Sequence, residues 1–135
     1  MKIPHQALVA LADGERLVIL RNIGQPFEPR FEKVSEPDLL LTNFHAGVRH
    51  QGSGGERTGG TDIDELAHGA AIAEWFNKAT LNGAQEPVVI AADPKTLGQI
   101  RQHCHQEFEA RIVGEVAKEL VNTPLPEVAR ILSEA

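Results

Sequence analysis

Two short runs of the chain consist only of apolar residues, and they constrain its fold more than any other feature. Residues 7–12 read Ala-Leu-Val-Ala-Leu-Ala, and residues 88–92 read Val-Val-Ile-Ala-Ala. Neither run alternates between apolar and polar residues, so each is typical of a strand that is buried on both faces. Helices must pack on a sheet that contains such strands, which favours an α/β fold.

The first run opens a predicted β-hairpin. The dipeptide Asp13-Gly14 follows it and suits the positive φ angles of a tight turn, and residues 17–20 then return as a second strand. A third strand is expected around residues 28–34. Proline lacks the amide donor of a strand ladder, and the prolines in and around this segment (Pro26, Pro29 and Pro37) place it at a sheet edge.

A long helix is predicted after residue 60. Its apolar residues recur at helical spacing, namely Ile63, Leu66, Ala70, Ala73 and Phe76. Asp62 and Glu65 resemble a capping pair at its start, and Asn82-Gly83 predicts its end.

The remaining elements follow the strand at residues 88–92. Asp93-Pro94 predicts a second helix start, and residues 123–124 open a last helix. Residues 111–120 fit both a strand and a helix, since Ile112, Val116 and Leu120 suit either spacing. Taken as a strand, this segment completes a mixed five-stranded sheet of two or three layers in a ribonuclease-H-like arrangement. Residues 7–12 would then lie centrally, parallel to residues 88–92.

Composition restricts the class of protein. The 135 residues correspond to a single domain, and the net charge of −6 argues against a broad electrostatic grip on nucleic acid or anionic membranes. No run approaches the roughly 18 apolar residues of a membrane-spanning helix, and no targeting segment is visible. Cys104 is the one cysteine, which excludes an internal disulfide and fits a cytoplasmic protein.

Residues 43–60 lack the pattern of any regular element. They contain half of the 12 glycines and little apolar surface, so we expect a long flexible loop. Its candidate binding residues are Arg49, His50, Gly54, Gly55, Glu56 and Arg57. The two arginines and the histidine would position phosphates without reading bases.

Several short motifs together resemble the bacterial host-attachment protein family. They are Lys2-Ile3-Pro4-His5, Val9-Ala10-Leu11-Ala12-Asp13-Gly14, Pro94-Lys95-Thr96-Leu97-Gly98 and Val116-Ala117-Lys118-Glu119-Leu120, the last matching the closing strand of that family. The resemblance implies attachment to host cells and carries no established chemistry.

The same family is similar to the middle domain of archaeal and eukaryotic peptide-chain release factors. In that domain a Gly-Gly-Gln loop follows the third strand and enters the peptidyl-transferase centre of the ribosome. The corresponding position here holds Gly54-Gly55-Glu56. The resemblance implies the fold and a working loop, but a carboxylate at the third position would meet the phosphate field of the ribosome unfavourably.

A metal site is a weaker hypothesis. Asp13 and Asp93 follow two strands that are predicted to be parallel neighbours, and with Asp62 or Glu65 they could bind two Mg²⁺ ions as nucleases of this fold do. Each of these carboxylates also suits an ordinary turn or helix cap. The six histidines (His5, His45, His50, His68, His103 and His105) are interpreted as surface residues, and Cys104 as a packing residue.

The sequence therefore favours a non-enzymatic binding module that contacts the ribosome or RNA through its glycine-rich loop. One alternative is a metal-dependent phosphodiesterase that uses Asp13, Asp93 and Glu65. Another is a protein-interaction domain that forms a homodimer through an uncovered edge strand. No metal or cofactor is predicted for the binding module.

Overall fold

The chain forms a mixed sheet at its centre. The computed structural model describes residues 1–39 and 57–135, with side chains for residues 1–39 and 67–135. The strands are β1 (Leu8–Ala12), β2 (Leu17–Asn22), β3 (Phe31–Ser35), β4 (Val88–Ala92) and β5 (Ile112–Val116), in the spatial order β3-β2-β1-β4-β5. β2 is antiparallel to β1 and β3, whereas β4 is parallel to β1 and β5. The predicted five-stranded sheet is confirmed, with β1 central and β3 at an edge.

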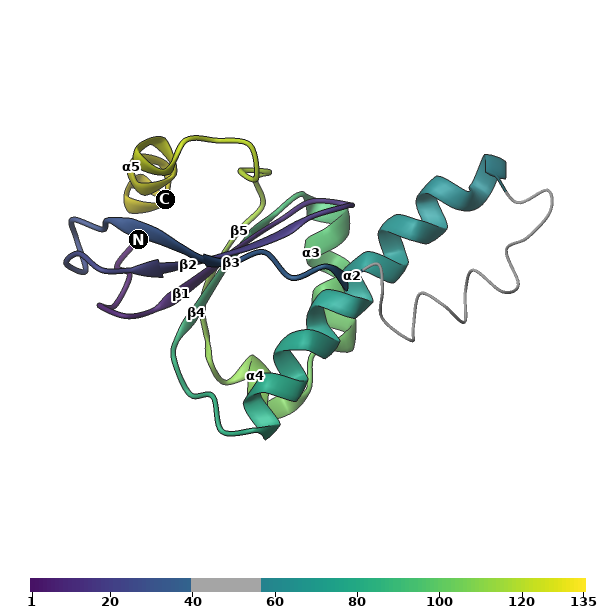
Figure 1. Cartoon of the computed structure of the whole chain (residues 1–135), viewed down its shortest axis with the longest axis horizontal. Helices are drawn as coiled ribbons and strands as arrows, with labels where there is room; N and C mark the ends of the chain where they lie inside the picture. Colours follow the sequence, from purple (N-terminus) through teal and green to yellow (C-terminus); the bar gives the residue numbers. More distant parts are fainter. Residues whose placement is uncertain (40–56) are drawn as a thin grey trace.

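Helices cover both faces of this sheet (Figure 1). The helices α2 (Arg57–Leu81), α3 (Pro94–His103) and α4 (Gln106–Glu109) lie on one face, and α5 (Leu125–Glu134) lies on the other. Successive strand side chains point to opposite faces, so β1 contributes to two cores. Leu8, Ala10 and Ala12 pack toward α2 and α3, while Val9 and Leu11 pack toward α5. The fold is therefore a three-layer α/β/α arrangement.

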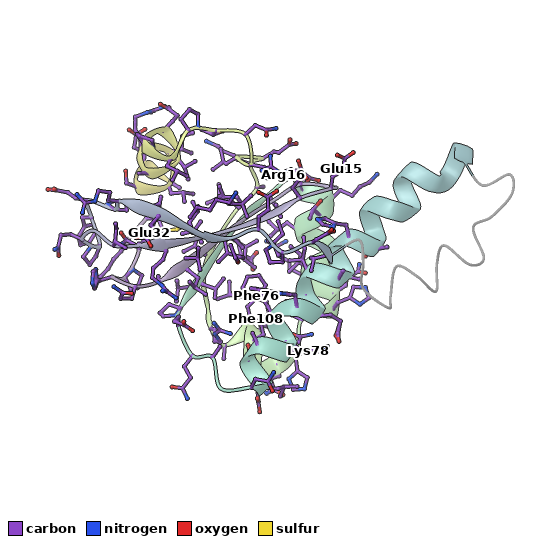
Figure 2. All side chains as sticks on the ribbon, in the orientation of Figure 1. Glu15, Arg16, Glu32, Phe76, Lys78 and Phe108 are labelled. Carbon is purple, nitrogen blue, oxygen red and sulfur yellow. The ribbon has the colours of Figure 1, made fainter. Side chains whose placement is uncertain are left out.

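The larger core is closed by aromatic contacts. The Phe76 ring of α2 stacks on the Phe108 ring of α4 with centroids 4.7 Å apart, and Figure 2 shows both rings between the helices and the sheet. The guanidinium carbon of Arg111 lies 5.9 Å from the Phe108 centroid, and Arg111 also donates to the Thr80 hydroxyl at 2.6 Å. These contacts join the end of α2 to the start of β5.

The predicted geometry of the first turn is wrong, although the hairpin itself is confirmed. Ala12 pairs with Leu17, which leaves four residues in the connection, and Gly14 does not have a positive φ angle. The Asp13 carboxylate accepts hydrogen bonds from the backbone amides of Glu15 at 2.8 Å and Arg16 at 2.7 Å. A side chain that bonds its own turn replaces the left-handed backbone that a two-residue connection requires.

The start of α2 also differs from the prediction. The helix begins at Arg57, so the predicted loop boundary at residue 60 is wrong and Asp62 lies inside the helix rather than at its cap. Glycine costs about 1 kcal/mol at a helical position, but adding a residue to an existing helix avoids the nucleation cost. A helix can therefore extend through Gly59 and Gly60.

Other predicted boundaries are confirmed. Gly83 has a φ of 106° and ends α2, and the Asp93 carboxylate caps α3 by accepting from the Thr96 amide at 3.1 Å. The ambiguous segment is a strand only over Ile112–Val116, so the expected closing strand does not extend to Leu120. β4 ends at Ala92 and α3 begins at Pro94, which leaves residues 117–120 without a strand to pair with. None of the described helices has the length and hydropathy needed to cross a membrane.

Candidate functional site

The carboxyl ends of β1 and β4 lie side by side. Ala12 pairs with Ala92 in parallel register, so Asp13 and Asp93 leave the sheet from adjacent strands as the sequence predicts. Open α/β sheets bind ligands at this kind of edge, outside the carboxyl ends of parallel strands. Each carboxylate nevertheless has a local partner that accounts for its position.

The Asp13 carboxylate forms its hydrogen bonds within its own turn. Besides accepting two backbone amides through Oδ1, its own amide donates to the Arg16 carbonyl at 3.1 Å. Asp93 caps α3 through Oδ2, which accepts from the Thr96 amide, and its backbone carbonyl accepts from the Leu97 amide at 2.9 Å. Its other oxygen, Oδ1, is buried and makes no hydrogen bond within the described part of the chain.

A metal centre at this edge stays a prediction. Within residues 1–39 and 67–135, no group of three or more histidine, cysteine, aspartate or glutamate side chains is arranged to hold a metal ion. Glu65 lies in α2, but its side chain is not among those described. Asp13 and Asp93 therefore follow adjacent strands, and the predicted contribution of Asp62 or Glu65 as a third ligand stays a prediction.

His68 lies on the side of α2 that faces the β1–β2 turn. Its side chain is buried, with 3% exposure, and neither ring nitrogen finds a hydrogen-bond partner among the described residues. Burial lowers the pKa of His68, while the Arg16 backbone and the carboxylates of Asp13 and Glu15 oppose that shift. The imidazole is therefore neutral near pH 7, which corrects the interpretation of this histidine as a surface residue.

The cations next to this turn are already paired. Figure 2 shows Glu15 and Arg16 at the end of the sheet opposite to Glu32. Arg16 binds the Glu36 carboxylate through two nitrogens at 2.8 and 3.0 Å, and Lys33 donates to the same carboxylate at 2.8 Å. The hydrogen bond from Arg16, followed by that from Lys33, lowers the pKa of Glu36 to about 2. This part of the edge therefore presents a neutralised cluster rather than a basic patch.

Most of the predicted loop site lies outside the described residues. This applies to Arg49, His50, Gly54, Gly55 and Glu56. Arg57 is the first residue of α2, and its side chain is not described. Along the chain the candidate residues follow β3 and end at the first residue of α2.

A groove that the sequence analysis missed lies at the other end of the sheet. It has a volume of about 700 Å³ and separates the β2–β3 loop (residues 23–30) from the start of α5. Its apolar walls include Ile23, Phe31 and Leu125. The two sides are about a hundred residues apart in the chain, so no local pattern could indicate the groove.

Asn22 holds the β2–β3 loop in shape. The side chain is fully buried, and its Oδ1 accepts from the amides of Gly24 at 2.9 Å and Arg30 at 3.1 Å. Its Nδ2 donates to the Ile3 carbonyl at 2.8 Å. A polar residue at the end of an apolar strand was the available signal for this role, because buried amides require such partners.

Comparison with known proteins identifies the family. No curated protein matches the chain. The family model described as bacterial archaeo-eukaryotic release factor family 12 matches residues 6–132, which include all five strands and most of α5. We conclude that the chain belongs to bacterial archaeo-eukaryotic release factor family 12.

Proposed function

We propose that this protein is a non-enzymatic binding module that contacts the ribosome or its RNA through residues 49–57. The observation that carries this proposal is the match to a release-factor family over residues 6–132. The position of the segment supports it, because residues 49–57 follow the third strand and end at the first residue of α2. The release-factor domain that the chain resembles carries its ribosome-contacting loop in the same place.

The charges of the segment suit phosphate groups. Arg49, His50 and Arg57 supply cations or hydrogen-bond donors, and contacts of this type position a protein on nucleic acid without base specificity. Several of the described arginines are paired within the chain, namely the half-buried Arg16 with Glu36, the exposed Arg101 and Arg130 with Glu115 and Glu127, and the buried Arg111 with Glu86. The segment is therefore the favoured source of phosphate contacts, and the net charge of −6 makes them weak and salt-dependent.

Peptide release is not part of this proposal. Gly54-Gly55 is followed by Glu56, whose carboxylate replaces the neutral amide of the release-factor loop. An anionic tip is repelled by the surrounding phosphates. We therefore expect binding without hydrolysis of peptidyl-tRNA.

Co-sedimentation with bacterial ribosomes tests the proposal. The protein should pellet with ribosomes at about 50 mM salt and much less at about 200 mM, because phosphate contacts release counterions. The double variant Arg49→Glu/Arg57→Glu should lose this binding. The matched control Lys78→Glu/Lys118→Glu makes the same change in net charge at exposed positions and should retain most of it. Absence of binding at both salt concentrations, or equal loss in both variants, contradicts the proposal.

Two further roles are kept as alternatives. Cleavage of a phosphodiester substrate that requires Mg²⁺ and is abolished by Asp13→Asn and Asp93→Asn would favour the phosphodiesterase hypothesis, for which the adjacency of β1 and β4 is the supporting observation. Attachment to host cells, which the resemblance implies, is proposed as an indirect consequence of binding in the cytoplasm. A deletion strain tests this link. If the wild type restores attachment to host cells and Arg49→Glu/Arg57→Glu does not, attachment depends on the proposed binding residues.

A further inference from the structure

The β2–β3 loop is a rigid hairpin tip. Ile23 donates to the Arg30 carbonyl at 2.8 Å, and Gln25 and Glu28 exchange backbone hydrogen bonds of 3.1 and 3.2 Å. Gly24 packs so closely that a Cβ atom there would lie 2.7 Å from the Arg30 amide nitrogen. Together with the hydrogen bonds of Asn22, these contacts hold the loop in one conformation before any partner arrives.

This rigid tip presents an aromatic ring to solvent. Phe27 stands between Gln25 and Glu28 and is 72% exposed, the largest exposed fraction among the large apolar side chains described. Exposed aromatic side chains on ordered loops act as anchors of protein interfaces, since they bury a large area at low entropic cost.

A receptor of suitable size lies beside the same loop. Figure 1 shows the β2–β3 loop and α5 at the same end of the sheet. The groove between them, about 700 Å³ in volume, has walls formed by Ile23, Pro29, Phe31, Leu125 and Ala129. The groove is open to solvent and larger than one phenyl ring, so it has room for such a ring, and its apolar walls suit that ring.

Opposite charges flank the groove. Glu28 and Arg30 both line it and are exposed, and neither forms an ion pair within the described part of the chain. The β2–β3 loop thus carries the exposed Phe27 ring, two opposite charges and one wall of an apolar groove, whose other wall is the start of α5. A surface that carries both halves of a contact has the features needed to pair with a second copy of itself about a two-fold axis.

We propose that two copies of this chain pair at this end of the sheet, each inserting Phe27 into the groove of the other. In this arrangement Glu28 of one copy lies against Arg30 of the partner subunit, and the reverse contact follows from the symmetry. The proposal is independent of ribosome binding, because the groove and residues 49–57 are separate parts of the chain. It also differs from dimerisation through an edge strand, since β3 contributes only Phe31 to the groove.

Sedimentation equilibrium over a range of protein concentrations tests this interface. We expect a monomer–dimer equilibrium that Phe27→Ser weakens by roughly thirtyfold or more, the usual effect of removing a central anchor. Leu81→Ser removes another exposed apolar side chain, and Val34→Ser removes one from the β3 edge; both should leave the equilibrium unchanged. All three side chains are exposed, so the variants should fold, and their melting temperatures check this.

Charge reversal at Glu28 and Arg30 tests the proposed orientation of the two copies. Glu28→Arg and Arg30→Glu should each weaken self-association about tenfold, because each places like charges across the two-fold axis. Mixing the two single variants should restore pairing as a heterodimer, and the double variant Glu28→Arg/Arg30→Glu should again form a homodimer. A chain that stays monomeric at all concentrations, a dimer that survives Phe27→Ser, or a mixture that fails to pair overturns the proposal.

Discussion

Gly69 of α2 lies so close to Gln99 of α3 that a Cβ atom at Gly69 would stand 2.5 Å from the Cβ of Gln99. The same atom would lie 3.3 Å from the Thr96 carbonyl oxygen. The two helices are therefore in backbone contact at this point, and Thr96 is buried with 1% exposure. The neighbouring residue, His68, is buried as well and faces the turn of the first hairpin.

Replacing Gly69 with alanine should destabilise the protein. In a free helix the change gains up to about 1 kcal/mol, but here the methyl group forces the helices apart, and overpacking costs about 1–3 kcal/mol. Gly98→Ala is the matched control, because a Cβ atom at Gly98 meets nothing within 4 Å and the helix gains propensity. Urea unfolding should show a lower stability for Gly69→Ala and an equal or higher stability for Gly98→Ala. Equal gains in both variants would contradict the close approach of α2 and α3.

Asn22→Ala should destabilise the domain and loosen the β2–β3 loop. The change leaves the amides of Gly24 and Arg30 without their acceptor, and each of these part-buried hydrogen bonds contributes about 0.5–1.5 kcal/mol. Asn82→Ala, at an exposed position, is the control. Hydrogen exchange at Gly24 and Arg30 should accelerate selectively in Asn22→Ala, whereas unchanged protection at both amides would exclude the predicted role.

Protonation of His68 should destabilise the folded protein in mild acid. Its folded pKa is lowered from the ordinary value of 6.5 by burial, so the unfolded state binds the proton first as the pH falls. The free energy of unfolding should therefore decrease as the pH falls below about 6.5, with a slope of at most about 1.4 kcal/mol per pH unit. The loss ends below the folded pKa, where both states are protonated.

The variant His68→Leu should remove this component of the pH dependence. Urea unfolding between about pH 8 and pH 5 measures it, and the difference between wild type and variant isolates His68 from the carboxylates. His103→Gln changes an exposed histidine and should reproduce the wild-type profile. Parallel profiles for wild type and His68→Leu would show that the ring is not held neutral by burial.

Cys104 should react slowly with thiol reagents. Burial, followed by the charges of Glu109 and Glu115, raises the pKa of the Cys104 thiol to about 11. The reactive thiolate is therefore scarce at pH 8. Reaction with a chromogenic disulfide should be slow in the native state and accelerate strongly in urea. A native rate equal to the rate in urea would contradict this, and Gly69→Ala should give an intermediate rate if α2 and α3 separate.

Local patterns predicted the elements whose signals lie within a few residues. The apolar runs of β1 and β4 indicated buried strands because both faces of each strand contact helices. Asp93-Pro94 indicated the start of α3 because a carboxylate and a fixed φ angle meet the needs of a helix start directly. The adjacency of Asp13 and Asp93 then followed from the parallel pairing of their strands.

Features that depend on contacts between distant parts of the chain could not be predicted from local sequence patterns. Asp13-Gly14 suited a two-residue turn, yet hydrogen bonds from the Asp13 side chain stabilise a longer one. His68 has no sequence signal for burial, because its environment is created by a hairpin more than fifty residues earlier in the chain. The groove depends on the packing of α5 against the β2–β3 loop, so its walls meet only in the folded protein.

The parallel register that joins Leu8 to Val88 has a consequence for biogenesis. The first hairpin leaves the ribosome before β4, the strand that completes the sheet centre, because β3 and α2 are synthesised between them. Until then, the nascent hairpin carries an open apolar edge of the kind that templates aggregation. Completion of the sheet centre therefore waits for residues 88–92, and a parallel pairing between strands so far apart in the chain slows folding.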